Sequence, residues 1–272
     1  MINFLDSLAA KLGCTMFCAD LTLKTVLIVF AGVLLGSFMD SIAGGGGIIT
    51  LPTYLLSGLP AHIALGTNKL SAGIGSSVAV LRYVRSGYVR WYLALPGAVL
   101  AIVGSALGTK LQLMLPEKYL QYVLLLVLPV VAFVVLKQRS LPETAGEICR
   151  KKQILIVSLS ALVIGAYDGF YGPGTGTFLL LIFCKLGKMD VRTANGNTKV
   201  INFSSNVGAL FTSLLSGKVF LALGLIGAAA SMLGNYIGSG LAIKNGSKIV
   251  RPVVVTVLIL LAVKVVSGLA GG

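Results

Sequence analysis

Apolar residues occur along this chain in long runs, without the periodicity of a soluble amphipathic helix or strand. Eight of these runs approach the ~20 residues that a membrane-spanning helix needs. They cover residues 24–43, 67–84, 91–109, 119–136, 153–170, 197–216, 219–243 and 249–268. Two further runs, 48–58 and 176–186, are much shorter. The pattern predicts an all-α polytopic membrane protein with eight long transmembrane helices and two short ones.

Each short run follows a cluster of glycines. The first cluster is Gly44-Gly45-Gly46-Gly47, and the second is Gly172-Pro173-Gly174-Thr175-Gly176. Glycine adopts turn conformations freely and lets another group approach the backbone closely. The sequence therefore predicts that two helices break and restart inside the membrane. The alternative is that these glycines only allow tight helix packing.

The two glycine breaks belong to an internal repeat. The stretch GTNKLSAGIGSSVAVLRYVRSGYV at 66–89 aligns without gaps with GNTKVINFSSNVGALFTSLLSGKV at 196–219. The predicted organisation follows from this alignment. It comprises an N-terminal interfacial segment (1–21), a first transmembrane repeat (22–140), an inter-repeat loop (141–152) and a second transmembrane repeat (153–272).

The distribution of charged residues predicts how the chain is oriented in the membrane. The chain carries 22 Lys and Arg against 8 Asp and Glu, yet only 11% of its residues are charged. The basic residues lie in short loops between apolar runs, as the positive-inside rule requires, so the charge does not indicate nucleic-acid binding.

If each short run completes a crossing, one face collects most of the basic residues. They then lie in the turns at 82–90, 137–152, 185–192 and 244–251. If the short runs turn back instead, the bias is weaker. The crossing model gives each repeat an odd number of segments, which makes the repeats inverted. It also predicts a multi-pass protein of the bacterial inner membrane with both termini outside.

Ionisable residues within the predicted spans form matched sets. Asp40 and Asp168 each precede a glycine break by four residues, and Lys69 and Lys199 lie at aligned positions of the repeat. Such residues are costly in a membrane and are functional by default. Three interpretations stay open. The aspartates and lysines form ion pairs that stabilise the fold, or the lysines bind substrate while the aspartates orient them or carry protons. In the third, the lysines extend to the membrane surface, since both lie near the starts of their apolar runs.

The helix restarts suggest what that substrate is. The first N–H groups of a helix have no partner within it, and the helix dipole adds partial positive charge there. Two restarts from opposite repeats would form a pocket suited to an anion. The predicted substrate-binding residues are Gly44, Gly45, Gly46, Gly47, Asn68, Lys69, Gly172, Gly174, Thr175, Gly176, Asn197, Lys199 and Asn202. Asp40 and Asp168 are predicted to serve coupling or charge pairing.

Several enzymatic functions are poorly supported. The chain has no GxxxxGK[ST] phosphate loop, and its one histidine, His62, lies in a predicted short turn. Cys14, Cys18, Cys149 and Cys184 lack the paired spacing of a metal site. The sequence therefore predicts neither an enzyme nor a bound metal or cofactor.

Four stretches resemble the sulfite exporter TauE/SafE family of membrane permeases, in its YfcA-like branch. They are GSFMDSIAGGGGIITLP (36–52), ALGTNKLSAGIGSS (64–77), GAYDGFYGPGTGTF (165–178) and NGNTKVINFSSNVGAL (195–210). The resemblance extends from about 22 to 270 and keeps the two-repeat plan. It implies transport, and it suggests sulfite or a small organosulfonate as the solute.

These observations together predict a secondary transporter that exports a small sulfur-containing oxyanion by alternating access. Its partners would be the small anionic solute and the lipid bilayer, and the oligomeric state, including a homo-oligomer, stays open. Two alternatives remain: a cation transporter or channel that uses Asp40 and Asp168, and a non-transporting membrane assembly partner.

Overall fold

The computed structural model describes residues 22–116, 144–250, 252, 253 and 256, and the regular structure within them is helical. The predicted interfacial segment 1–21, the predicted helix 119–136 and most of the predicted helix 249–268 lie outside the described residues. The rest of the chain forms an all-α membrane protein whose two halves follow the same plan.

Among the described residues, each half contributes four helices, and corresponding helices have nearly equal lengths. The first half contributes α2 (Leu23–Ala43), α3 (Gly47–Leu56), α4 (Ala61–Arg85) and α5 (Trp91–Met114). The second half contributes α7 (Arg150–Phe170), α8 (Thr175–Lys185), α9 (Val191–Leu215) and α10 (Leu221–Asn245). The lengths are 21, 10, 25 and 24 residues in the first half and 21, 11, 25 and 25 in the second.

The two 25-residue helices begin earlier than hydropathy predicts. α4 starts at Ala61 and α9 at Val191, whereas the apolar runs start at 67 and 197. The first turns of α9 carry polar residues that a hydropathy reading assigns to a loop. The Asp190 carboxylate caps this helix by accepting hydrogen bonds from the N–H groups of Arg192 and Thr193 at 3.1 and 3.0 Å. Each buried lysine is therefore the ninth residue of its helix, too deep to reach the surface.

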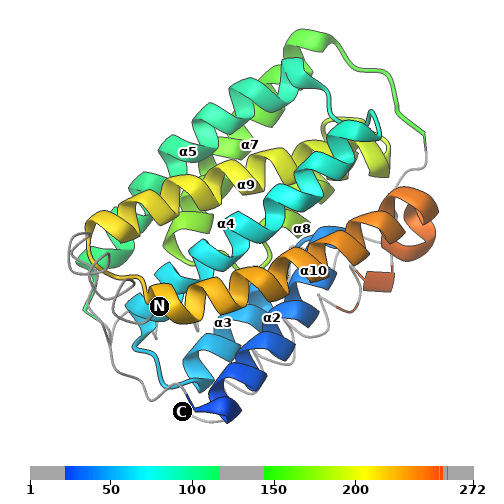
Figure 1. Ribbon diagram of the computed structural model, residues 1–272. Helices are drawn as coiled ribbons and strands as arrows, with labels where there is room; N and C mark the ends of the chain where they lie inside the picture. The colour runs from blue at the N-terminus through cyan, green and yellow to red at the C-terminus, as the bar shows by residue number, and fades with distance from the viewer. Residues whose placement is uncertain (1–21, 117–143, 251, 254–255, 257–272) are drawn as a thin grey trace, which may run out of the picture.

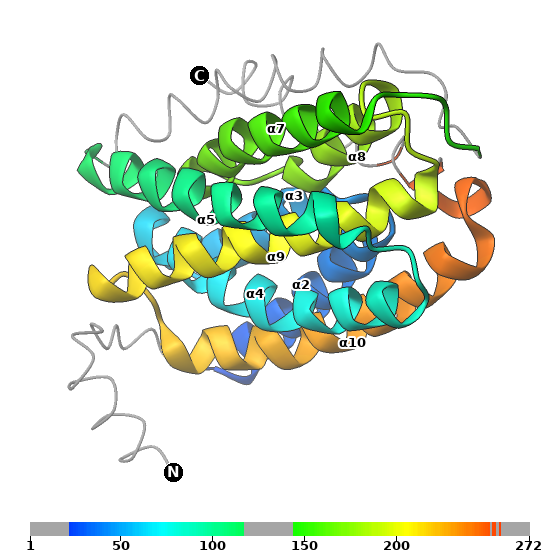
Figure 2. The ribbon, with the colours of Figure 1, turned by 90° about the horizontal axis from the view of Figure 1, so that it is seen from above.

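The last described helix of each half packs against helices of the other half. α10 packs mainly on α2 and α4, and α5 packs mainly on α7 and α9 (Figure 1). The molecule thus consists of two bundles, one of α2, α3, α4 and α10 and the other of α5, α7, α8 and α9. They meet where α4 contacts α9, at the centre of the molecule (Figure 2). We call them the first and the second bundle.

Small residues allow these exchanged helices to approach closely. A Cβ on Gly104 of α5 would lie 2.3 Å from the carbonyl oxygen of Leu162 in α7. A Cβ on Gly234 of α10 would lie 2.4 Å from the carbonyl oxygen of Leu34 in α2. In each helix a second glycine follows four residues later, which is the small-xxx-small spacing of membrane helix contacts.

The outer helices turn apolar side chains outward. In the part of the chain that the structure describes, α2, α5, α7 and α10 are the four helices long and apolar enough to cross a membrane. Leu95, Val99, Val103 and Leu107 form an exposed stripe along α5 at four-residue spacing. A stripe of this kind is unfavourable in water and suits a lipid environment. The more polar α4 and α9 lie between these outer helices (Figure 2).

Each short helix runs antiparallel to the long helix before it and returns towards the end of the molecule where that long helix began. A Cβ on Gly36 of α2 would lie 2.5 Å from Thr50 of α3, and one on Gly32 would lie 2.3 Å from Thr53, so α3 runs antiparallel to α2. In the second half, Gln153 Nε2 near the start of α7 donates to the carbonyl of Gly187, just beyond α8, at 2.6 Å. Each short helix begins in the interior, at a glycine break, and ends where its preceding long helix began.

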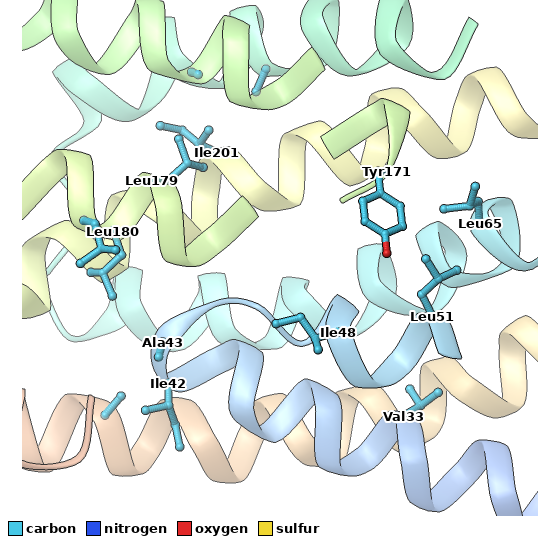
Figure 3. Close-up of a cluster of buried hydrophobic side chains, with 14 of the residues drawn as sticks. Val33, Ile42, Ala43, Ile48, Leu51, Leu65, Tyr171, Leu179, Leu180 and Ile201 are labelled. Carbon is cyan, nitrogen blue, oxygen red and sulfur yellow. The ribbon is translucent and has the colours of Figure 1, made fainter. Parts of the chain in front are cut away.

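Apolar side chains from both halves seal the two breaks. Ile42 and Ile48 flank the first break, Tyr171 lies at the second, and all three belong to one buried cluster (Figure 3). The same cluster contains Leu179 of α8 and Ile201 of α9. The breaks are therefore packed parts of the core rather than surface loops.

Most of the basic turns gather at one end of the molecule. The Arg90 N–H donates to Asn197 Oδ1 at 3.2 Å, and Arg192 Nε donates to the Ile243 carbonyl at 3.0 Å. These contacts join the α4–α5 turn, the start of α9 and the end of α10. We call this end the basic end; its basic residues are Arg82, Arg85, Arg90, Arg150, Lys151, Lys152, Lys185, Lys188, Arg192, Lys244 and Lys248. It unites the described parts of the turns that the crossing model places on one face.

Two glycines test the packing of the breaks. Gly44 and Gly58 both have positive φ, +77° and +87°, but only Gly44 is enclosed. A Cβ there would lie 2.2 Å from the backbone of Gly176, whereas a Cβ on Gly58 meets nothing within 4 Å. We expect Gly58→Ala to cost only the ~1–2 kcal/mol of a left-handed residue. Gly44→Ala adds overpacking of about 1–3 kcal/mol. Thermal unfolding in detergent measures both, and equal losses would contradict this packing.

Candidate functional site

The two glycine breaks meet at the centre of the molecule. Gly44 lies against the backbone of Gly176 and Thr177, and a Cβ on Gly47 would come within 3.1 Å of Pro173 Cα. The Thr177 hydroxyl donates to the carbonyl of Ala43 at 3.0 Å, which fixes one break to the other. The N-termini of α3 and α8 are thereby brought together by contacts between glycine backbones that side chains would prevent.

Two ion pairs cross between the sequence halves and between the bundles. Lys69 Nζ of α4 lies 2.8 Å from Asp168 Oδ2 of α7. Lys199 Nζ of α9 lies 3.0 Å from Asp40 Oδ2 of α2 and also donates to the Asp40 carbonyl. Lys69, Asp168 and Lys199 are 4%, 3% and 0% exposed. This burial excludes lysines that extend to the membrane surface.

Further hydrogen bonds hold the two carboxylates. Asp40 Oδ1 accepts from the N–H of Gly46 at 3.3 Å, so this aspartate joins Lys199 to the N-terminus of α3. Asp168 Oδ2 accepts from the Ser205 hydroxyl at 2.7 Å. A Cβ on Gly172 would lie 3.1 Å from both Lys69 Nζ and Asp168 Oδ1, so a side chain there would displace this pair.

A small cavity lies beside the breaks. Its volume is about 40 Å³, which gives room for roughly three waters at the ~10–15 Å³ that each needs. Its walls come from both bundles: Ser37, Asp40, Gly45, Gly46, Gly47, Thr50, Asn68, Lys69, Ala72, Asp168, Gly172, Thr175, Gly176, Asn202, Asn206, Ser231 and Asn235.

Two helix N-termini face this cavity with free donors. Gly47 opens α3, Gly176 is the second residue of α8, and both line the wall. Neither amide N–H has a hydrogen-bond partner among the described residues. Free N–H groups of this kind, with the helix dipole behind them, attract negative charge. Lys69 lies in the same wall, so the cavity combines backbone donors with an ammonium group.

The structure places most of the predicted site residues in one wall. Nine of the substrate-binding candidates line the cavity, together with both predicted charge-pair aspartates: Gly45, Gly46, Gly47, Asn68, Lys69, Gly172, Thr175, Gly176 and Asn202, with Asp40 and Asp168.

Four candidates lie elsewhere. Gly44 is buried between the breaks, and Gly174 has φ +89° in the turn before α8. Asn197 donates to the Thr193 carbonyl and accepts from Arg90 near the basic end. Lys199 is sealed against Asp40. These positions need glycine or a polar group to form the fold around the cavity, which the sequence pattern alone does not distinguish from lining the cavity.

Six lining residues are absent from the predicted site: Ser37, Thr50, Ala72, Asn206, Ser231 and Asn235. Ser231 and Asn235 lie one turn apart in the middle of the largely apolar α10, and Asn235 Nδ2 donates to the Ser231 carbonyl at 3.0 Å. Ser37 of α2 shares a hydrogen bond of 2.7 Å with the Ser231 hydroxyl. A polar residue in an apolar membrane helix is itself a sign of function. The sequence alone could therefore have indicated Ser231 and Asn235.

An all-helical membrane fold with paired charges and paired helix breaks in its centre defines a membrane transporter. Comparison with known proteins agrees with this class. The model of the family described as sulfite exporter TauE/SafE matches residues 28–265. The chain therefore belongs to the sulfite exporter TauE/SafE family.

Three relatives show how far the likeness extends. The chain is 36% identical to a probable membrane transporter protein, ORF9, of Sinorhizobium, over 91% of this chain and 95% of the relative. It is 32% identical to a probable membrane transporter protein of Haemophilus influenzae, over 91% and 96%. It is also 32% identical to the probable membrane transporter protein YfcA of Escherichia coli K12, over 87% and 88%. No solved structure matches the chain.

The buried ion pair of Lys199 and Asp40 should behave as one unit in stability measurements. Lys199→Gln leaves the Asp40 carboxylate without its cation, and breaking a buried pair in this way typically costs about 3–5 kcal/mol. Adding Asp40→Asn removes the stranded charge, so we expect the double variant to be more stable than Lys199→Gln alone. Thermal unfolding of the two single variants and the double variant measures the coupling, with the exposed Lys185→Gln as control. Additive losses would contradict the pair.

Proposed function

We propose that the protein is a secondary transporter of a small sulfur-containing oxyanion, which it exports by alternating access. The observation that carries this proposal is the cavity in which Lys69 and the N-termini of α3 and α8 converge. The family description names sulfite export, and the donors of this wall suit the chemistry of an oxyanion.

The size of the cavity supports a small solute. About 40 Å³ matches an anion of a few heavy atoms better than an extended organic molecule. A larger organosulfonate would need the bundles to separate before it could enter. Sulfite is therefore the preferred candidate within this class.

The positions of the ion pairs support movement between the bundles. Lys69 and Asp168 lie in different bundles, as do Lys199 and Asp40. An anion that binds Lys69 competes with Asp168 for the ammonium group. Binding would thus weaken one of the two charged links between the bundles, and the cavity would open towards one end at a time. Asp168 would orient Lys69 in the empty protein or take up a proton when the anion binds.

The aspartates favour the anion over the cation alternative. Each carboxylate already has a lysine as partner, so a metal cation would have to displace an ammonium group.

The order of the helices supports inverted repeats. It is the same in both halves, and the hairpins α2–α3 and α7–α8 enter from opposite ends of the molecule.

The site calls for a charge-balanced test of Lys69. In the variant Lys69→Gln with Asp168→Asn no buried charge is stranded, so the fold should survive while the ammonium donor is lost. A ligand that binds only the folded state stabilises it by ~2.7 kcal/mol at a hundredfold excess over Kd. We expect sulfite to raise the thermal stability of the wild type and of the control Lys110→Gln, but not of the double variant.

Sulfite flux into proteoliposomes should show the same order. Wild-type flux and affinity in the folded Lys69 double variant would contradict the anion assignment. A stabilisation of the wild type by Na⁺ and not by sulfite, lost in Asp40→Asn and in Asp168→Asn, would favour the cation alternative.

Cys149 tests the orientation in the membrane. This exposed cysteine directly precedes α7 at the basic end, which we assign to the cytoplasm of a bacterial inner membrane. In a background with Cys14, Cys18 and Cys184 replaced by serine, we expect a membrane-impermeant maleimide to label Cys149 in inverted vesicles and not in intact spheroplasts. Labelling in spheroplasts would reverse the orientation.

A further inference from the structure

Two asparagines in the cavity wall keep carboxamide oxygens without partners. Asn68 of α4 is 7% exposed and Asn235 of α10 is 2% exposed, and both line the cavity. The Oδ1 atom of each is closed to solvent and accepts no hydrogen bond from the residues that the structure describes. A buried acceptor without a donor is costly, so each of these oxygens is a position where a hydrogen-bond donor would be stabilising.

The orientation of Asn235 is fixed by its neighbours. Its Nδ2 donates to the Ser231 carbonyl at 3.0 Å and approaches the Ser231 hydroxyl at 3.3 Å. A carbonyl oxygen can only accept, so turning the carboxamide over would set two oxygens against each other. The free atom of Asn235 is therefore an acceptor, and Ser231 is itself held by Ser37.

The charges of the wall point in the same direction. Asp40 and Asp168 line the cavity with Lys69, whereas Lys199 does not. Each of these carboxylates is already balanced by one lysine, so the wall has no net positive charge to offset the two charges of a dianion. A monoanion meets less repulsion, and the free N–H groups of α3 and α8 and the Lys69 ammonium are enough to receive its oxygens.

We propose that this cavity selects anions that also donate a hydrogen bond: small monoanions with a hydroxyl or N–H group. The inference rests on the proposed anion site and specifies its ligand. The anionic oxygens face Lys69 and the N-termini of α3 and α8, and the donor group is received by Asn235. For sulfite, the selected form is the protonated monoanion in its hydroxyl form rather than the dianion.

Two sulfur oxyanions differ in little besides this donor. Sulfamate and methanesulfonate are both tetrahedral monoanions of similar size, but sulfamate carries an amino group where methanesulfonate carries a methyl group. Titration calorimetry of the wild-type protein in detergent, at one pH and one ionic strength, gives a Kd for each. We expect sulfamate to bind about tenfold more tightly, the scale of one satisfied buried acceptor.

Variants then assign the preference to the wall. Asn235→Leu should bring the ratio of the two Kd values towards one. The matched control is Asn245→Leu, in the same helix but outside the cavity, because Asn245 Nδ2 donates to the Leu241 carbonyl at 2.9 Å as Asn235 does to Ser231. This control should keep the wild-type ratio.

The outcomes separate this inference from the proposed function. Equal Kd values in the wild type, with binding that depends on Lys69, would leave the anion site standing and overturn the donor requirement, as expected if water occupies the positions beside Asn68 and Asn235. A sulfamate preference that persists in Asn235→Leu would also overturn it. Binding of neither anion would overturn the anion site together with the donor requirement.

Discussion

A lysine in the interior of a membrane protein must have an anionic partner, and this requirement organises the whole molecule. Lys69 and Lys199 are the ninth residues of 25-residue helices, with no route to the surface. Each finds its carboxylate in the opposite half of the chain. Since an unpaired charge in this environment is strongly unfavourable, neither half can bury its own polar helix without the other.

The exchange of α5 and α10 between the bundles follows the same logic. The polar helices α4 and α9 must be shielded from lipid, and glycine positions let α5 pack on α7 and α10 on α2 at short range. The outer helices then present leucine and valine stripes outward. The polar interior and the apolar exterior are two consequences of one arrangement, in which a segment from each half completes the bundle of the other.

The helices, the two glycine breaks and most of the cavity residues could be predicted from the sequence, because each of them depends on a local signal. Hydropathy locates α2, α5, α7 and α10, glycine clusters locate the breaks, and charged residues within spans are conspicuous. Sequence reasoning could not tell Lys69 from Lys199, since aligned residues of a repeat look alike and only packing shows that one lines the cavity while the other is sealed. It also placed the starts of α4 and α9 too late, because polar first turns resemble loops.

The chemistry of the cavity departs from the repeat that builds it. In the alignment of 66–89 with 196–219, Asn68 corresponds to Thr198, and continuing the same register pairs Asn235 with Ser105. Asn68 and Asn235 line the cavity, whereas Thr198 and Ser105 do not. The polar wall of Ser37, Ser231 and Asn235 therefore belongs to the first bundle alone. A fold built from two similar halves creates the meeting point of two helix N-termini, and the residues that break the similarity make the polar wall beside it different on its two sides.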